Sequence, residues 1–254
     1  MLKKLVFFTF LLFCCCASQD YSQIKVVDVV DGDTIRLSNG YLLRYIGLDT
    51  PEVHIKKGKD FIYSPQPFAL EATEFNRKLV EGKYVRIEFD VVRKDKYGRL
   101  LGYCFVGDKF VNAELIKSGY ASLYTFPPNV KYVDSFVRLQ KQARKGLKGF
   151  WGVLTVLDAD EARKYINQIR TVRGMVLSTY QSRNCVYLNF GRDYKTDFTV
   201  VIFNNSLKYF NHKGIEPVSF YKRKIVQVTG KIKEYNGPEI IVNSPYEIEI
   251  IDSP

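Results

Sequence analysis

The chain has 254 residues, which is enough for one large domain or for two small domains with separate cores. Apolar residues make up 46% of it, a share that excludes a mainly disordered chain as the first interpretation. The net charge of +11 indicates a polyanionic partner, with nucleic acid as the first candidate and an acidic membrane surface as the second, whereas a basic surface kept for solubility is the alternative.

The N-terminal segment predicts export. A basic start at residues 1–4 precedes an unbroken apolar run over residues 5–13, which is too short for a spanning helix of ~20 residues. We therefore expect residues 1–17 to be a signal peptide and the protein to be extracytoplasmic. The cysteines at 14–16 leave two forms open: cleavage after Ala17 would release a secreted or periplasmic protein, and acylation of a cysteine would give a membrane-anchored lipoprotein. The cysteine cluster favours the lipoprotein.

The following residues predict a β-meander that continues into mixed helix and strand. Turn residues at 31–33 and 38–40 separate the first apolar, β-rich runs. Residues 54–67 are polar, contain glycine and proline, and are expected to form a loop. The expected strands are 25–30, 34–37, 41–48, 83–91 and 100–106, and the expected helices are 68–80, 111–118 and 133–146. Five strands with three helices indicate an α+β barrel rather than a doubly wound sheet.

The character of the chain changes after Trp151. Residues 158–168 are polar and are expected to bridge two domains, which we place at 21–157 and 165–254. From residue 170 onward the pattern is nearly all β, with one helical stretch after the third expected strand. The expected strands are 172–177, 185–190, 197–203, 225–232, 239–242 and 248–251. This order is the outline of a second, OB-like β-barrel.

Two cysteines, Cys104 and Cys185, lie in apolar, strand-like runs of the two expected domains. We expect both to be small buried apolar side chains rather than a disulfide across the domains. The sequence contains no Cys/His spacing typical of a metal site.

Three short motifs carry candidate chemistry: Asp-Gly-Asp-Thr at 31–34, Arg-Tyr-Ile-Gly-Leu-Asp-Thr-Pro-Glu at 44–52, and Asp-Lys-Tyr-Gly-Arg at 95–99. Carboxylate oxygens suit a hard cation such as calcium, and Asp33 and Asp49 supply two of them from neighbouring β elements. A guanidinium presents a planar fork of donors that matches phosphate oxygens.

Each motif also has an ordinary structural explanation. The first could be only a hairpin turn, the second only a helix start with proline in its first turn, and Arg44 only a barrel side chain reaching solvent. However, packing gives no reason for an arginine within an apolar strand five residues before Asp49, because an unpaired buried charge is costly. The combination therefore favours a functional site.

In order and spacing, these motifs resemble the staphylococcal nuclease (thermonuclease) family over residues 25–151. Asn-Ala-Glu-Leu at 112–115 fits the second helix of that family, and Gln-Ala-Arg at 142–144 with Gly-Phe-Trp at 149–151 fits its last helix and closing tryptophan. The resemblance implies that the first domain is a nuclease-like, OB-type five-stranded β-barrel with three helices. The second domain resembles small OB-like modules found beside such nuclease domains.

The resemblance also implies roles for individual residues. Asp33, Asp49 and the backbone carbonyl of Thr50 would bind Ca²⁺. Arg44 and Arg99 would bind the scissile phosphate and its transition state, and Glu52 would act as the general base or orient the attacking water. The candidate substrate contacts are Lys96, Tyr97, Tyr124 and Phe126, although their rings could equally belong to the core. Phe126 stands where the family tends to have tyrosine, a change that keeps stacking and removes a hydroxyl contact.

The implied activity is a calcium-dependent, thermonuclease-type endonuclease that hydrolyses phosphodiester bonds of DNA and also of RNA. The alternative is a catalytically weak or inactive nucleic-acid-binding protein with a nuclease-like fold, which the complete motif set disfavours. No protein partner is implied. Because all recognisable chemistry precedes Trp151, the second domain is expected to affect substrate affinity or stability rather than bond breaking.

Overall fold

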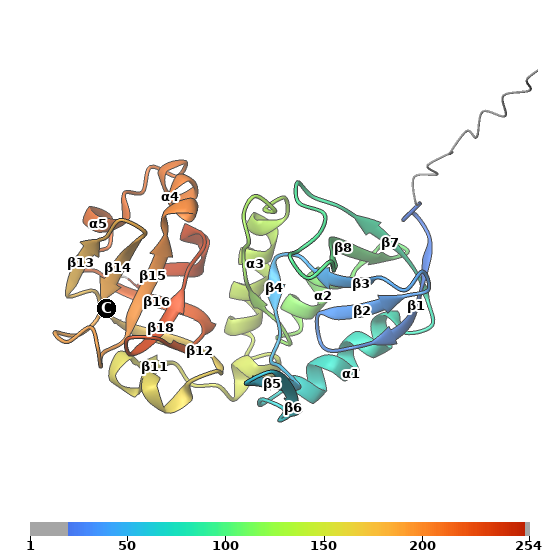
Figure 1. The fold of residues 1–254 in the computed structure, drawn as a ribbon, viewed down its shortest axis with the longest axis horizontal. Coiled ribbons are helices and arrows are strands. Elements are labelled where there is room, and N and C mark those ends of the chain that lie inside the picture. Colours follow the sequence, from blue (N-terminus) through green and yellow to red (C-terminus); the bar gives the residue numbers. More distant parts are fainter. Residues whose placement is uncertain (1–19, 252–254) are drawn as a thin grey trace, which may run out of the picture.

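A computed structural model describes residues 20–251 of the chain. The expected signal peptide and the cysteines at 14–16 lie outside the described residues. Two β units lie side by side, with helix α3 (Val133–Lys145) between them (Figure 1). We refer to the sheets of strands β1–β10 with their helices as the N-terminal unit, and to those of β11–β19 as the C-terminal unit.

The N-terminal unit is built on a six-stranded sheet in the order β3-β2-β1-β7-β8-β9. An additional parallel pairing of β3 with β8 closes five of these strands into a barrel. The strands are β1 (Ile24–Val29), β2 (Thr34–Leu37), β3 (Leu42–Tyr45), β7 (Tyr84–Glu88), β8 (Leu100–Val106) and β9 (Lys109–Phe110). The predicted α+β barrel is thereby confirmed.

Three helices pack around this barrel: α1 (Ala69–Val80), α2 (Val111–Lys117) and α3. Asn112 on α2 is fully buried, accepts a hydrogen bond from Cys104 N (2.9 Å) and donates one to Ile46 O (2.9 Å). It therefore ties the helix to the segment that leads into the site. Gly47 in that segment has φ +85°, and a Cβ there would lie 2.5 Å from the ring of Phe136, so the close approach of α3 requires glycine.

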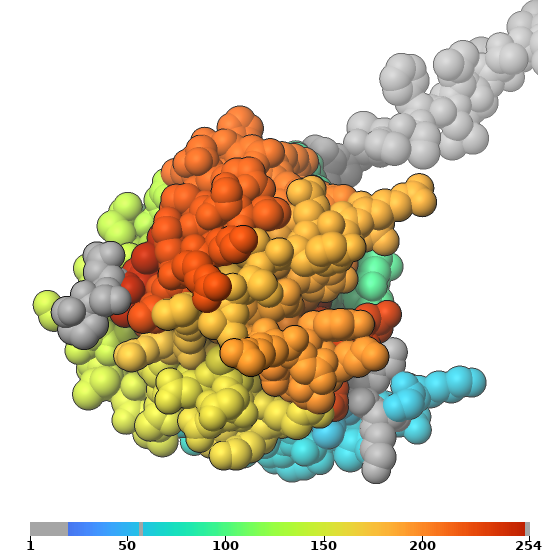
Figure 2. Space-filling model, turned by 90° about the vertical axis from the view of Figure 1, so that its left-hand side faces the viewer, coloured from blue at the N-terminus to red at the C-terminus, as the bar shows by residue number. Residues whose placement is uncertain are grey.

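The prediction of a loop at residues 54–67 was wrong for most of its length. Strands β5 (His54–Lys57) and β6 (Asp60–Tyr63) form a hairpin instead, with Gly58 in its turn at φ +65°. Ile55 pairs with Ile62, which Phe61 and Tyr63 flank on the second strand. These β-forming residues outweigh the polar composition of the segment. Figure 2, seen from the side of the C-terminal unit, shows this hairpin projecting past that unit.

Two short strands complete the N-terminal unit beside the barrel. Strand β4 (Leu48–Asp49) pairs with β10 (Ser122–Leu123) in an antiparallel manner. The pairing places Asp49 opposite Ser122 and fixes the segment that follows the third strand of the barrel. The single strand expected over 41–48 is therefore broken at Ile46 and Gly47, where the chain turns.

The C-terminal unit contains two sheets, in the orders β11-β12-β16-β19 and β13-β14-β15-β18-β17. A Cβ at Gly230 would lie 2.8 Å from Ile240 of the other sheet, so the two sheets pack closely. The strands are β11 (Leu157–Asp158), β12 (Ile169–Met175), β13 (Ser178–Gln181), β14 (Cys185–Asn189), β15 (Thr199–Phe203), β16 (Ile225–Lys231), β17 (Lys233–Glu234), β18 (Pro238–Ile241) and β19 (Ile248–Ile250). Helices α4 (Asn204–Asn211) and α5 (Pro217–Phe220) follow β15. The predicted mainly β character of this part is confirmed.

The expected polar bridge is more ordered than its composition indicated. Strand β11 ends at its first residue, Asp158, and a 3₁₀ helix follows over Ala159–Tyr165, with Ala162 buried in the core of the C-terminal unit. Cys104 and Cys185 are both buried free thiols, as expected. Among residues 20–251, no helix has the length and apolar character that crossing a bilayer would need.

Candidate active site

The turn between β1 and β2 places Asp33 at the barrel rim. Asp31 accepts a hydrogen bond from Asp33 N (3.0 Å), and its backbone carbonyl accepts one from Asn76 Nδ2 (3.1 Å). Asp33 is 5% exposed, and its Oδ2 accepts hydrogen bonds from the backbone N and the hydroxyl of Thr50, both at 3.1 Å. A Cβ at Gly32 would lie 2.7 Å from Thr50 Oγ1, so only glycine allows this approach.

Arg44 lies between the two predicted cation ligands. Its strand β3 pairs with β2, so that Arg44 stands opposite Thr34, the neighbour of Asp33. Its Nη2 donates to Asp49 Oδ1 at 2.7 Å, and its Nη1 forms an ion pair with Asp33 Oδ2. Both terminal nitrogens of Arg44 therefore face carboxylate oxygens inside the protein. The side chain therefore does not reach solvent as a snorkelling arginine would.

Negative charge exceeds positive charge in this buried cluster. Burial alone would lower the pKa of Arg44, but the carboxylates of Asp33, Asp49, Asp31 and Glu52 raise it above its ordinary value. Burial, opposed by Arg44 and reinforced by Asp33, raises the pKa of Asp49 to about 7. Burial and the neighbouring Asp33 raise the pKa of Asp31 to about 8. One guanidinium thus does not balance the surrounding carboxylates, and an added cation would be favourable there.

Arg99 is held by its own turn. Asp95 Oδ2 accepts a hydrogen bond from Arg99 Nε at 2.7 Å, and Asp95 Oδ1 accepts from the backbone nitrogens of Tyr97 (2.9 Å) and Arg99 (3.0 Å). Arg99 directly precedes β8, whose parallel pairing with β3 brings Leu100 beside Leu43. The fold therefore brings Arg99 to the strand that carries Arg44. Asp95, to which the sequence had assigned no role, orients it.

Glu52 is approached from two directions. Its backbone N donates to Gln66 Oε1 at 2.9 Å, and its backbone O accepts from Gln66 N at 2.9 Å. Its side chain is 40% exposed, and Oε1 lies 3.6 Å from Lys231 Nζ of the C-terminal unit. Neither partner could be predicted from the sequence, because Gln66 lies in the expected loop and Lys231 in the other expected domain.

The candidate substrate contacts differ in placement. Tyr97 is 74% exposed and Phe126 is 57% exposed, so both rings face solvent and neither belongs to the core. Lys96 is exposed and stacks its Nζ over Tyr97, 5.0 Å from the ring centre. Tyr124 is only partly exposed, and burial together with the charge of Asp49 raises its pKa. Tyr124 is thus the candidate next to the carboxylate cluster.

The donor set fits a hard divalent cation. Within residues 20–251, no group of three or more His, Cys, Asp or Glu side chains is arranged to hold a metal. Two carboxylates, Asp33 and Asp49, with the carbonyl of Thr50 would therefore leave most of a calcium shell of six to eight oxygens to water and substrate. Such a site would bind calcium weakly without substrate, and the surplus of negative charge around Arg44 favours the cation.

The closed barrel, the carboxylates around Arg44, and Arg99 next to the paired strand together indicate a protein of the nuclease class. The family model for staphylococcal nuclease homologues matches residues 42–153, which include Arg44, Asp49, Glu52 and Arg99. The thermonuclease of Staphylococcus hyicus is 38% identical over 130 residues, covering 50% of this chain and 74% of that protein. The chain therefore belongs to the staphylococcal nuclease homologue family.

Other relatives agree with this assignment. The thermonuclease of Staphylococcus intermedius is 38% identical over 126 residues, which cover 48% of this chain and 72% of that protein. The endonuclease YncB of Bacillus subtilis is 38% identical over 140 residues, which cover 51% of this chain and 64% of that protein. The family match ends at residue 153, so the C-terminal unit lies outside it.

Proposed function

We propose that the protein is a calcium-dependent endonuclease that hydrolyses phosphodiester bonds of DNA and RNA outside the cytoplasm. The observation that carries the proposal is the buried Arg44 guanidinium between Asp33 and Asp49, in a cluster whose carboxylates outnumber it. One guanidinium does not balance these carboxylates, so a bound cation would stabilise the cluster.

The residues of the chain divide the work of phosphodiester cleavage. Asp33, Asp49 and the Thr50 carbonyl would hold Ca²⁺, which when bound offsets charge that builds up on the phosphate. Arg44 would bind an oxygen of the scissile phosphate. Arg99, fixed to Asp95 through Nε, presents its terminal nitrogens to the same phosphate.

Glu52 would take a proton from the attacking water or orient that water. Gln66 forms hydrogen bonds with both the backbone N and the backbone O of Glu52. These bonds fix the position of the backbone from which the carboxylate extends. General bases of this kind must lie within hydrogen-bond reach of the proton they remove, and the partial exposure of Glu52 leaves room for water beside it. Tyr97, Lys96, Tyr124 and Phe126 are proposed to contact the nucleotides on either side of the bond.

Export rests on the sequence pattern of residues 1–17. The basic start and short apolar run support a signal peptide, and the cysteines at 14–16 support membrane attachment through a lipidated cysteine. Labelling cells with a radioactive fatty acid, in the wild type and in a chain with the three cysteines changed to serine, would test this attachment. Equal labelling of the two chains, or none in the wild type, would reject it.

The activity is tested with the purified protein, supercoiled plasmid and single-stranded DNA. We expect nicking and degradation in millimolar CaCl₂. We expect no cleavage in excess EGTA, because the chelator removes the calcium that Asp33 and Asp49 would hold. Full cleavage in excess chelator would reject the calcium assignment. Binding of DNA in calcium without any cleavage would instead establish the non-catalytic alternative.

A further inference from the structure

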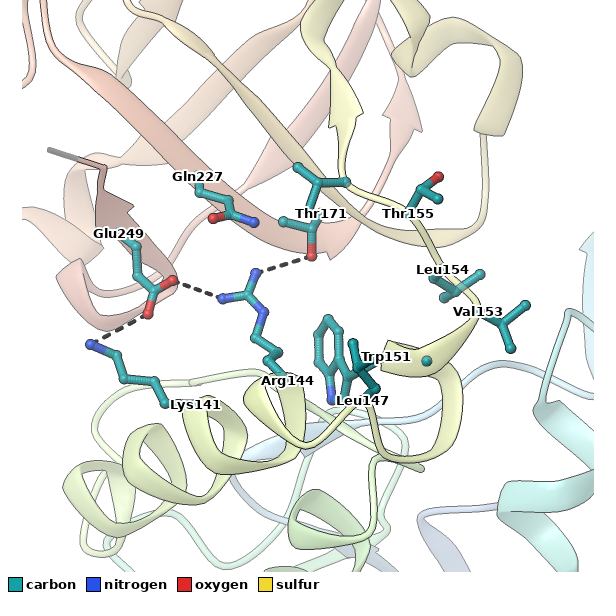
Figure 3. A pocket seen from close by; sticks show the side chains of 12 residues that line it. Lys141, Arg144, Leu147, Trp151, Val153, Leu154, Thr155, Thr171, Gln227 and Glu249 are labelled. Atoms are coloured by element: carbon teal, nitrogen blue, oxygen red, sulfur yellow. Dashed lines mark hydrogen bonds and ion pairs between the residues drawn. The ribbon is translucent and has the colours of Figure 1, made fainter. Parts of the chain in front are cut away.

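The C-terminal unit is joined to the N-terminal unit by partly buried polar contacts. Arg144 on α3 donates from Nη1 to Glu249 Oε2 (2.8 Å) and from Nη2 to Thr229 Oγ1 (2.9 Å) and Thr171 Oγ1 (3.1 Å). Of these residues, Arg144, Thr171 and Glu249 border a cleft of about 500 Å³ between α3 and the C-terminal sheet (Figure 3). The contacts fix the orientation of that sheet relative to the nuclease barrel.

A second set of contacts reaches the loop after β10. Glu247 is 7% exposed and accepts a hydrogen bond from Thr125 N at 2.7 Å and another from the Thr125 hydroxyl. Ser244 Oγ lies 2.9 Å from the same hydroxyl. Because Thr125 follows Tyr124 directly, the C-terminal unit also supports a candidate substrate residue.

One edge of the C-terminal unit extends to Glu52 itself. Lys231 is the last residue of β16 and pairs with Ile169 of β12, so its position is set by the sheet. Strand β16 lies beside β10, and β10 pairs with β4, which carries Asp49. This chain of neighbours brings Lys231 Nζ to 3.6 Å from Glu52 Oε1.

The same edge also holds the backbone of Glu52. Gln66, which hydrogen-bonds both backbone groups of Glu52, donates from Nε2 to the carbonyl of Asn167. Asn167 N in turn donates to Ile232 O at 2.7 Å, next to Lys231. The side chain and the backbone of Glu52 are therefore both tied to the junction of β12 and β16.

We propose that Lys231 is a positioning residue of the nuclease site, supplied by the C-terminal unit, which holds the Glu52 carboxylate in its working orientation. The inference rests on the proposed function, in which Glu52 handles the attacking water. It changes the expectation from the sequence that the second domain affects only affinity or stability. The charge of Lys231 also acts on Asp49, which places the ammonium within the electrostatic range of the carboxylate cluster.

The test compares the rate of cleavage at saturating DNA and calcium in full-length variants. Lys231→Met keeps the length of the side chain and removes its charge, and should lower kcat by about fivefold, the upper range for a partly exposed ion pair. Lys231→Arg should restore most of the rate. Lys233→Met is the matched control, because Lys233 is exposed on the next strand and pairs with Glu239.

A double-mutant cycle with Glu52→Gln shows whether Lys231 acts through Glu52. In the Glu52→Gln background, Lys231→Met should leave kcat unchanged. The inference is overturned if Lys231→Met cleaves at the wild-type rate, or if it lowers kcat equally in both backgrounds. A wild-type protein that does not cleave would reject the proposed function together with this inference, whereas an active wild type with an unaffected Lys231→Met would reject this inference alone.

Discussion

Replacing Arg144 with methionine should weaken the junction between the two units substantially. The guanidinium is 18% exposed, donates to Glu249 and to two buried threonine hydroxyls, and lies over the ring of Trp151 at 5.0 Å. Removing one partner of a buried ion pair costs about 3–5 kcal/mol. Glu249 is 28% exposed and can regain water, and the hydroxyls of Thr171 and Thr229 lie 2.8 Å apart and can bond each other. We therefore expect a loss of about 3 kcal/mol, at the low end of that range.

Lys141→Met is the matched control for this experiment. Lys141 contacts the same Glu249, with Nζ 3.4 Å from Oε1, but its side chain is 61% exposed. An exposed pair of this kind contributes about 0–1 kcal/mol. Urea unfolding of both variants, followed by circular dichroism and by tryptophan fluorescence, measures the free energies and shows whether the two units separate into two transitions. An Arg144→Met protein within 1 kcal/mol of Lys141→Met would refute the view that Arg144 anchors the junction.

Three further predictions concern the site and its supports. Arg99→Ala should lower kcat by about a hundredfold, the scale for losing one transition-state donor, and wild-type turnover in a cleavage assay would eliminate its role as a phosphate ligand. Gly32→Ala should displace Thr50, because the new Cβ would lie 2.7 Å from its hydroxyl, so calcium titration of the variant should show weaker binding, and unchanged affinity would contradict this. Burial raises the pKa of Glu247 from 4.5 to about 7, so the folded state holds a proton that the unfolded state releases in this range. The contribution of Glu247 to stability should thus be greatest below pH 4.5 and be lost as the pH rises through 7. Urea unfolding at several pH values should show that the unfolding free energy of Glu247→Gln falls less over this range than that of the wild type. An equal fall in both proteins would be inconsistent with the raised pKa.

The barrel and the motif residues could be predicted because their signals are local. Alternating apolar residues and glycine-containing turns marked the strands of the barrel, and helical spacing marked α1 and α3 within one residue at either end. The hairpin at His54–Tyr63 was missed because polar residues, glycine and proline indicate a loop by composition, whereas backbone pairing depends on residues across the turn.

The supports of the site could not be predicted, because they join residues far apart in the sequence. Lys231 ends strand β16 and Glu52 lies in the segment between β4 and β5, and nothing near either residue signals the other. The same holds for Thr125 with Glu247 and for Arg144 with Glu249, which are 122 and 105 positions apart. Short motifs identify groups capable of chemistry, but the contacts that orient those groups depend on how the two units pack.

The central claim is that the fork of Arg44, held between Asp33 and Asp49, binds the phosphate that is cleaved. The most direct measurement compares DNA cleavage in calcium by Arg44→Lys and by Arg36→Lys, a control on strand β2 whose side chain is 47% exposed. Lysine keeps the positive charge but cannot present two donors in one plane. We predict that Arg44→Lys binds DNA and loses about a hundredfold or more in kcat, while Arg36→Lys keeps the wild-type rate. An Arg44→Lys protein that cleaves as fast as the control would contradict the claim.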